Sequence, residues 1–127
     1  LNTSVGLLRG TVAGTDIYRH MTNYGPLNID LSKYSGVEVS IKYRYTSETP
    51  SDMIVYFITD EDRTWGEDKN RYEKHISTDS GDEFVVYTFD FSKNKKWTGT
   101  LRGLRFDAFR AANGSFEIDY IRLIPKE

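Results

Sequence analysis

A tryptophan in the longest polar segment of the chain is the residue best suited to bind a ligand. Trp65 lies within residues 60–71, directly after the apolar stretch 53–59. An aromatic face can stack on the axial C–H groups of a pyranose, while polar neighbours such as Arg63 hydrogen bond with its hydroxyls. The pattern favours a sugar site on this loop. The alternative is that Trp65 folds back and covers an edge of the protein.

A second group of candidate residues would come together on one face of a sheet. Tyr56 and Tyr72 flank the Trp65 loop, and Arg105 and Asp107 occupy alternate positions of a later segment. Alternate residues of a strand face the same side, so Arg105 and Asp107 could offer paired hydrogen bonds to vicinal hydroxyls. A surface ion pair between them is at least as good an explanation.

The acidic residues of the loop do not form a calcium loop of the EF-hand type. Asp60, Asp62 and Thr64 have suitable spacing, but Gly66 falls one position late. Arg71 then stands where that loop needs a bidentate glutamate. A solvated acidic loop is the better interpretation.

Other site chemistries have little support in the sequence. His20 and His75 are the only histidines and cysteine is absent, so a zinc site would need a third ligand that the spacing does not identify. Asp107 and Asp119 could be imagined as the carboxylate pair of a glycoside hydrolase. Because no motif specifies an acid, a base or a nucleophile, we predict that the protein is not an enzyme.

The elements that carry these residues are predicted to be β-strands. Residues 37–45 alternate between apolar and polar side chains, and strands are also predicted at 53–59, 84–91, 104–108 and 116–120, with shorter candidates at 5–12 and 27–31. Turn residues separate these segments, and no segment has a sustained helical period. We therefore predict an all-β, two-layer antiparallel β-sandwich, for which a jelly-roll is one possible connectivity.

The same period predicts which side chains are buried. Phe116, Ile118 and Tyr120 should share one face, Asn113-Gly114 should form a hairpin turn, and Trp97 should be structural. The core is predicted to include Val39, Ile41, Val55, Phe57, Phe89, Phe106 and Ile118.

Size and composition limit the possible functions. The chain has 127 residues, enough for one domain with one core, and its net charge of −2 comes without a basic stripe. Nucleic acid is therefore not expected as a partner, and no apolar stretch is long enough for membrane insertion. Residues 1–127 are expected to be a single β-sandwich module excised from a larger protein.

Several motifs together resemble a known family. They lie at residues 10–16, 27–34, 60–69, 87–90, 97–99, 104–107 and 114–123. In this order they are similar to the galactose-binding-like β-jelly-roll modules, a type of carbohydrate-binding module found in bacterial surface proteins, glycoside hydrolases and phage adhesion proteins.

The resemblance implies a function and a cofactor. It implies non-catalytic glycan binding by a module of an exported multidomain protein, at an extracellular or cell-surface location and covalently linked to neighbouring domains. It also implies a structural calcium ion held by Asp119, although an acidic, Trp-containing N-terminal segment common in such modules is not found here.

Two other functions remain open. One is a structural or protein-interaction spacer without a sugar ligand, for example in a surface or phage tail protein. The other is an accessory domain that shapes the cleft of a neighbouring enzyme. The exposure of the Trp65 ring discriminates between the sugar site and the spacer.

Overall fold

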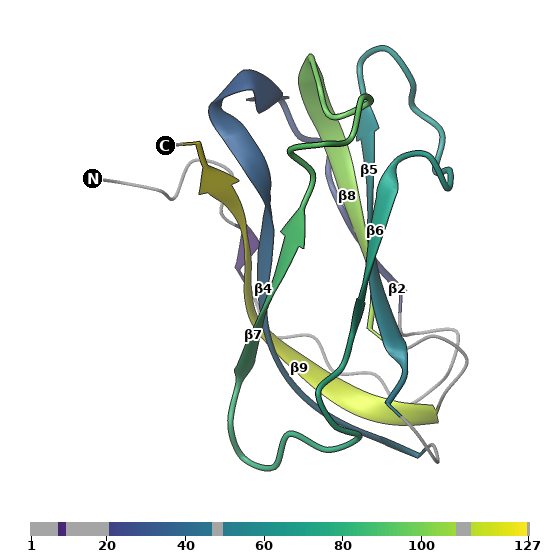
Figure 1. Ribbon diagram of the computed structural model, residues 1–127, viewed down its shortest axis with the longest axis vertical. Helices are drawn as coiled ribbons and strands as arrows, with labels where there is room; N and C mark the ends of the chain where they lie inside the picture. Colours follow the sequence, from purple (N-terminus) through teal and green to yellow (C-terminus); the bar gives the residue numbers. More distant parts are fainter. Residues whose placement is uncertain (1–7, 10–20, 47–49, 109–112, 127) are drawn as a thin grey trace.

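The protein consists of two antiparallel sheets packed face to face (Figure 1). The computed structural model describes residues 8–9, 21–46, 50–108 and 113–126. The first sheet, here the β4 sheet, has the strand order β1 (Leu8–Arg9), β9 (Asn113–Pro125), β4 (Tyr34–Thr46) and β7 (Val85–Asp90). The second, the β5 sheet, has the order β2 (Met21–Tyr24), β8 (Thr100–Asp107), β5 (Asp52–Thr59) and β6 (Asn70–Lys74), and β3 (Ile29–Asp30) also pairs with β8.

The predicted two-layer antiparallel sandwich is confirmed by this arrangement. Every pairing between the named strands is antiparallel. The chain crosses from one sheet to the other after β1, β3, β4, β6, β7 and β8, which is compatible with the predicted jelly-roll. The described part contains a single 3₁₀ turn, Leu31–Lys33, and no helix in it is long and apolar enough to span a bilayer.

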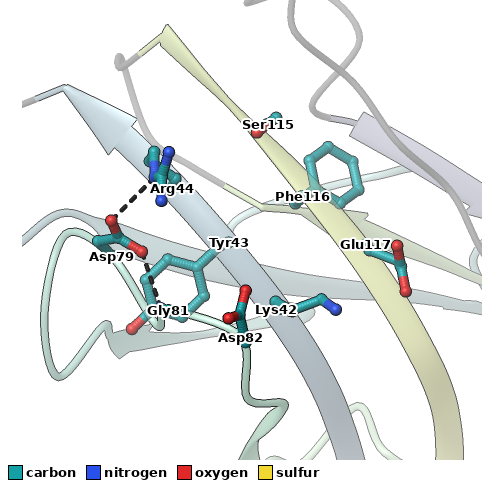
Figure 2. A pocket seen from close by; sticks show the side chains of 9 residues that line it. All are labelled: Lys42, Tyr43, Arg44, Asp79, Gly81, Asp82, Ser115, Phe116 and Glu117. Carbon is teal, nitrogen blue, oxygen red and sulfur yellow. Dashed lines mark hydrogen bonds and ion pairs between the residues drawn. The ribbon is translucent and has the colours of Figure 1, made fainter.

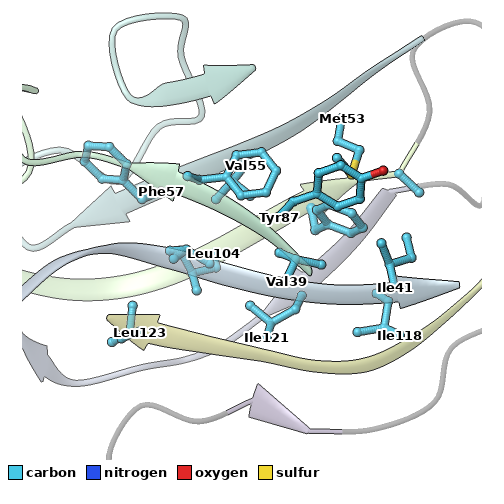
Figure 3. Close-up of a cluster of buried hydrophobic side chains, with 14 of the residues drawn as sticks. Val39, Ile41, Met53, Val55, Phe57, Tyr87, Leu104, Ile118, Ile121 and Leu123 are labelled. Carbon is cyan, nitrogen blue, oxygen red and sulfur yellow. The ribbon is translucent and has the colours of Figure 1, made fainter. Parts of the chain in front are cut away.

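The core lies between the two sheets and is formed by alternate residues of their strands (Figure 3). All seven predicted core residues are at most 1% exposed: Val39, Ile41, Val55, Phe57, Phe89, Phe106 and Ile118. Because successive side chains of a strand point to opposite faces, burying one set places the other set on the outside of each sheet.

A β-bulge in β9 overturns the predicted orientation of Tyr120. Ser40 pairs with Tyr120 but the next residue, Ile41, pairs with Ile118, so Asp119 has no partner across the ladder. The extra residue reverses the alternation, as bulges do. Ile121 and Leu123 enter the core instead, and Tyr120 donates a hydrogen bond to Glu38 Oε2 at 2.6 Å on the outer face.

The turn predicted at Asn113-Gly114 is wrong, because both residues are already in β9. They pair with Thr46 and Tyr45 of β4. A Cβ on Gly114 would lie 2.3 Å from the Arg44 carbonyl oxygen, so the glycine permits close strand contact and does not form a turn. The unpredicted strands β2 and β6 are short and lack an apolar period, and β6 takes the last two residues of the predicted loop 60–71.

Candidate functional site

Four predicted site residues meet on the outer face of the β5 sheet. Tyr56 of β5 lies opposite Arg105 of β8, and one row along, Ile54 lies opposite both Tyr72 of β6 and Asp107 of β8. These residues alternate with core side chains, so their own side chains face outward. Tyr56, Tyr72, Arg105 and Asp107, with Glu67 described below, are called the sheet-face cluster.

Glu67 joins the two tyrosines of this cluster. The Tyr56 hydroxyl donates to Glu67 Oε2 at 3.0 Å, and the Tyr72 hydroxyl donates to Glu67 Oε1 at 2.9 Å. Burial, followed by the hydrogen bond to Glu67, raises the pKa of Tyr56 to about 12, so its phenol stays protonated at neutral pH. One carboxylate therefore fixes two aromatic side chains and ties the loop to the sheet.

Arg105 and Asp107 form an ion pair, the alternative that the sequence left open for these two residues. Arg105 Nε and one terminal nitrogen donate to the two oxygens of Asp107, each at 3.0 Å. Burial raises the pKa of Asp107, against the opposing effect of the guanidinium. Arg105 also lies over the Tyr56 ring, with its central carbon 4.6 Å from the centroid.

Tyr56 is thus a support beneath Arg105 and not an open stacking surface. Its side chain is buried, and the guanidinium covers one face of its ring. The more accessible members of the cluster are Glu67, which is exposed, and Tyr72 and Arg105, which are partly exposed, whereas Asp107 is buried like Tyr56.

The loop that carries Trp65 is held by a buried lysine. Lys69 is 1% exposed, and its ammonium group pairs with Asp62 Oδ1 at 2.9 Å. The same ammonium donates to the Thr64 carbonyl oxygen and hydroxyl. Asp62 Oδ1 also accepts from the Thr64 amide and hydroxyl, at 3.1 and 2.6 Å, and these bonds and Lys69 lower the pKa of Asp62.

Another acidic residue anchors the loop to β8. Asp60 Oδ1 accepts a hydrogen bond from the Thr100 amide at 3.1 Å, beside Gly99, which has a φ of 82°. Asp60 and Asp62, considered above as calcium ligands, are therefore used to build the loop. These structural contacts explain why the loop is acidic although it lacks the pattern of a calcium-binding loop.

Trp65 and Arg63 line a hollow between this loop and the β5 sheet. The hollow has a volume of about 350 Å³ and is lined by Tyr24, Gly25, Pro26, Leu27, Ile58, Arg63, Trp65, Arg102 and Gly103. Trp65 is half-buried and does not belong to the core cluster. This space is called the Trp65 hollow.

The Trp65 hollow continues into the sheet-face cluster. Ile58 and Tyr56 are alternate residues of β5, and Gly103 and Arg105 are alternate residues of β8; Ile58 pairs with Gly103. A Cβ on Gly103 would lie 3.2 Å from Ile58 Cδ1, so the glycine keeps the floor of the hollow open. The loop and the sheet face, predicted as alternative sites, are two parts of one outer surface.

A second hollow lies on the opposite sheet and has a different character (Figure 2). Its volume is about 270 Å³, and its lining mixes the charges of Lys42, Arg44, Asp79, Asp82 and Glu117. Its aromatic lining residues, Tyr43 and Phe116, are only 2% and 3% exposed. Arg44 Nε binds Asp79 at 2.8 Å, so these charges stabilise the loop that follows β6.

Trp97 and His75, by contrast, are structural. The Trp97 indole stacks on Phe91 with a centroid distance of 4.7 Å, and its N–H donates to the Tyr34 carbonyl at 2.9 Å. His75 is 2% exposed, with Nε2 lying 2.7 Å from the Ala108 carbonyl oxygen. The predicted structural role of Trp97 is confirmed by its burial.

Asp119, the predicted calcium ligand, is exposed at the bulge of β9. Among the residues for which the structure gives positions, no three carboxylate or histidine side chains gather as a metal site would require. Asp107 and Asp119 lie on different sheets, so they do not form the imagined catalytic pair. His20 and most of the first predicted strand lie outside the described residues.

Several residues of this surface were not predicted from the sequence. Glu67 was part of the predicted loop but had no assigned role, and Tyr24, Leu27 and Arg102 were not considered. Arg102 sits in an irregularity of the β5–β8 pairing, and Leu27 is placed by its amide donating to the Arg102 carbonyl at 2.8 Å. Only the strand register brings these segments beside Trp65.

No protein-family model matches the chain, and no curated protein matches it. Among solved structures, the chain is similar to one described as "CBM4 structure and function", with 15% identity and a TM-score of 0.48, covering 92% of this chain and 72% of that one. It is also similar to "BiXyn10A CBM1 APO", with 10% identity and a TM-score of 0.33, covering 94% and 72%.

A third similar structure is an enzyme, the isomalto-dextranase of Arthrobacter globiformis T6 complexed with panose. The identity is 16% and the TM-score 0.38, covering 81% of this chain and 15% of that one. Similarity at this level does not extend to the residues of a binding site. The descriptions of two of these three structures name a CBM, the abbreviation for a carbohydrate-binding module, which is the class of domain that the sequence resembles.

Proposed function

We propose that this chain is a non-catalytic carbohydrate-binding module that holds a glycan on the outer face of the β5 sheet. The observation that carries the proposal is the continuity between the Trp65 hollow and the sheet-face cluster. The hollow supplies a partly exposed indole, and the cluster supplies oriented hydrogen-bonding groups along the neighbouring strands.

The chemistry of this surface matches that of a sugar chain. A pyranose has an apolar face that packs on an aromatic ring, and its hydroxyls need donors and acceptors at its rim. Trp65 would stack on one sugar, and Tyr72, Arg105 and Asp107 would hydrogen bond with the next units along the chain.

Rigidity favours binding at this position. Lys69 and Asp62 fix the loop, and Glu67 fixes both tyrosines. A site that is already ordered loses less entropy when its ligand binds. The expected affinity is still modest, with a dissociation constant on the order of micromolar to millimolar, because one stacked ring and a few solvent-exposed hydrogen bonds supply about 4–8 kcal/mol.

The proposal extends to the setting of the domain. A glycan-binding module acts where glycans are displayed, so we place it at the cell surface or outside the cell, linked to neighbouring domains of a larger protein.

The test is a glycan array on the 127-residue chain, followed by calorimetry with the glycan that binds best. Trp65→Ala should reduce affinity at least tenfold without changing the melting temperature. The control is Phe84→Ala, which removes an aromatic ring from the segment leading into β7 of the other sheet. Phe84 is 37% exposed, and this variant should bind the glycan as well as the wild type does. If no glycan binds, the spacer function replaces this proposal.

A further inference from the structure

Among the residues that the structure describes, the charges lining the Trp65 hollow are all of one sign. Of these lining residues only Arg63 and Arg102 are charged, and both are cations. They come from different elements, Arg63 from the loop 60–69 and Arg102 from β8. The second hollow, in comparison, mixes both signs. These residues therefore give the lining of the Trp65 hollow a net positive charge.

Neither guanidinium forms an ion pair within the described part of the chain. Arg63 is exposed, and a terminal nitrogen of Arg102 donates to Asn28 Oδ1 at 3.0 Å. Arg102 Nε is buried and has no acceptor among the described residues. A guanidinium has five N–H donors, so most of the donor capacity of Arg102 is unused by these residues.

Four acidic groups of the loop and the sheet face are engaged in other contacts. Asp62 pairs with the buried Lys69, Asp60 accepts from Thr100, and Glu67 accepts from two tyrosines. Asp107 accepts hydrogen bonds from Arg105 Nε and from one terminal nitrogen of the same side chain. These carboxylates shape the loop and the sheet face, and none of them lines the hollow.

We propose that the Trp65 hollow binds an acidic sugar, with Trp65 stacked on its ring and Arg63 and Arg102 recognising its carboxylate. This inference rests on the proposed glycan-binding function and specifies the class of ligand. The planar fork of an arginine matches a carboxylate with two parallel hydrogen bonds. A hollow of about 350 Å³ lies at the small end of ligand pockets, which range over about 300–1,000 Å³, and suits a single sugar unit.

The test uses oligosaccharides in matched pairs, each acidic chain with its carboxyl-reduced counterpart. The probes are oligogalacturonate, oligoglucuronate and oligomannuronate, the neutral form of each, and sulfated galactan oligosaccharides, all titrated into the 127-residue chain. We expect one uronate to bind at least tenfold more tightly than its reduced form. Arg63→Gln and Arg102→Gln should each remove most of this preference while leaving the melting temperature unchanged.

Arg71→Gln is the matched control. Arg71 lies on β6 of the same sheet, opposite Val55 in the strand register. Its Nε forms an ion pair with Glu73 Oε2 at 3.0 Å, and Arg71 does not line the hollow. Its loss should leave the preference intact. If a reduced or neutral glycan binds as well as the uronates, or a sulfated one binds better, the acidic-sugar inference is wrong while glycan binding stands. If neither these probes nor the general array bind, both proposals fail.

Discussion

The two tryptophans show how context decides the role of a residue. Trp97 follows a polar turn but stacks on Phe91 and meets Phe57 edge-on, inside the core. Trp65 also follows polar residues, yet it remains outside the core and lines a hollow. The Trp-Thr-Gly sequence correctly predicted a structural Trp97. The partial exposure of Trp65 meets the condition that the sugar hypothesis required, and its ligand remains a prediction.

The buried His75 predicts how stability depends on pH. Burial lowers the pKa of His75 from 6.5 to about 4, against weaker opposing effects of the Ala108 carbonyl and Asp52. Above pH 6.5 the imidazole is neutral in both the folded and unfolded states. Below it the unfolded chain binds a proton that the folded protein does not, so the free energy of unfolding falls until about pH 4.

The expected loss between pH 7 and 4.5 is about 2–3 kcal/mol, since one pKa unit corresponds to about 1.4 kcal/mol. Urea melts at several pH values measure it. His75→Gln should flatten the dependence. A wild-type stability that is constant over this range would contradict the assignment of His75 as a buried neutral group.

At the scale of elements, the strand period predicted the core but not the irregular positions. The seven predicted core residues are buried because alternation follows directly from strand geometry. The bulge at Asp119 reversed that alternation, so Tyr120 went to the outside. Strand register also decides which distant segments meet, and this explains why Arg102 and Leu27 could not be placed beside Trp65.

The loop 60–69 depends on Lys69 for its shape. Lys69→Met keeps an unbranched side chain as far as Cε but removes the ammonium that binds Asp62 and Thr64. The loop should become more mobile and hold Trp65 less well, so glycan affinity should fall several-fold while the core stays folded. Calorimetry and hydrogen exchange of the loop amides measure both effects.

The matched control is Lys74→Met, because Lys74 is exposed on β6 of the same sheet. It should leave both measurements unchanged. Unaltered exchange and affinity in Lys69→Met would show that the loop does not need this lysine.

At the scale of the whole molecule, calcium remains a prediction that rests on the family resemblance. Asp119 offers the oxygen donor that calcium prefers, and its exposure at the bulge leaves it accessible. If it holds a calcium ion, adding calcium should raise the melting temperature and a chelator should lower it, because the ion stabilises the folded state by mass action.

Asp119→Ala should abolish that shift, whereas Asp82→Ala, an exposed residue in the turn before β7, should retain it. Identical melting temperatures with calcium and with chelator would show that the folded protein does not bind a stabilising calcium ion.

The two sheets present different outer surfaces, and the central claim is that the glycan binds to only one of them. The β5 sheet carries the Trp65 hollow and the sheet-face cluster, while the β4 sheet carries the mixed charges around Lys42 and Glu117. The candidate binding residues predicted from the sequence all lie on the side of the β5 sheet. That the loop and the sheet face form one surface could not be predicted, because it depends on which strands pair.

The most direct test is a map of backbone amide shifts by nuclear magnetic resonance, recorded while the array-selected glycan is titrated into the labelled 127-residue chain. We predict that the shifts concentrate on residues 54–58 of β5, 103–107 of β8 and 63–67 of the loop. Signals of Lys42, Asp82 and Glu117 should stay unchanged. Shifts confined to those three residues and their neighbours on the β4 sheet would contradict the account.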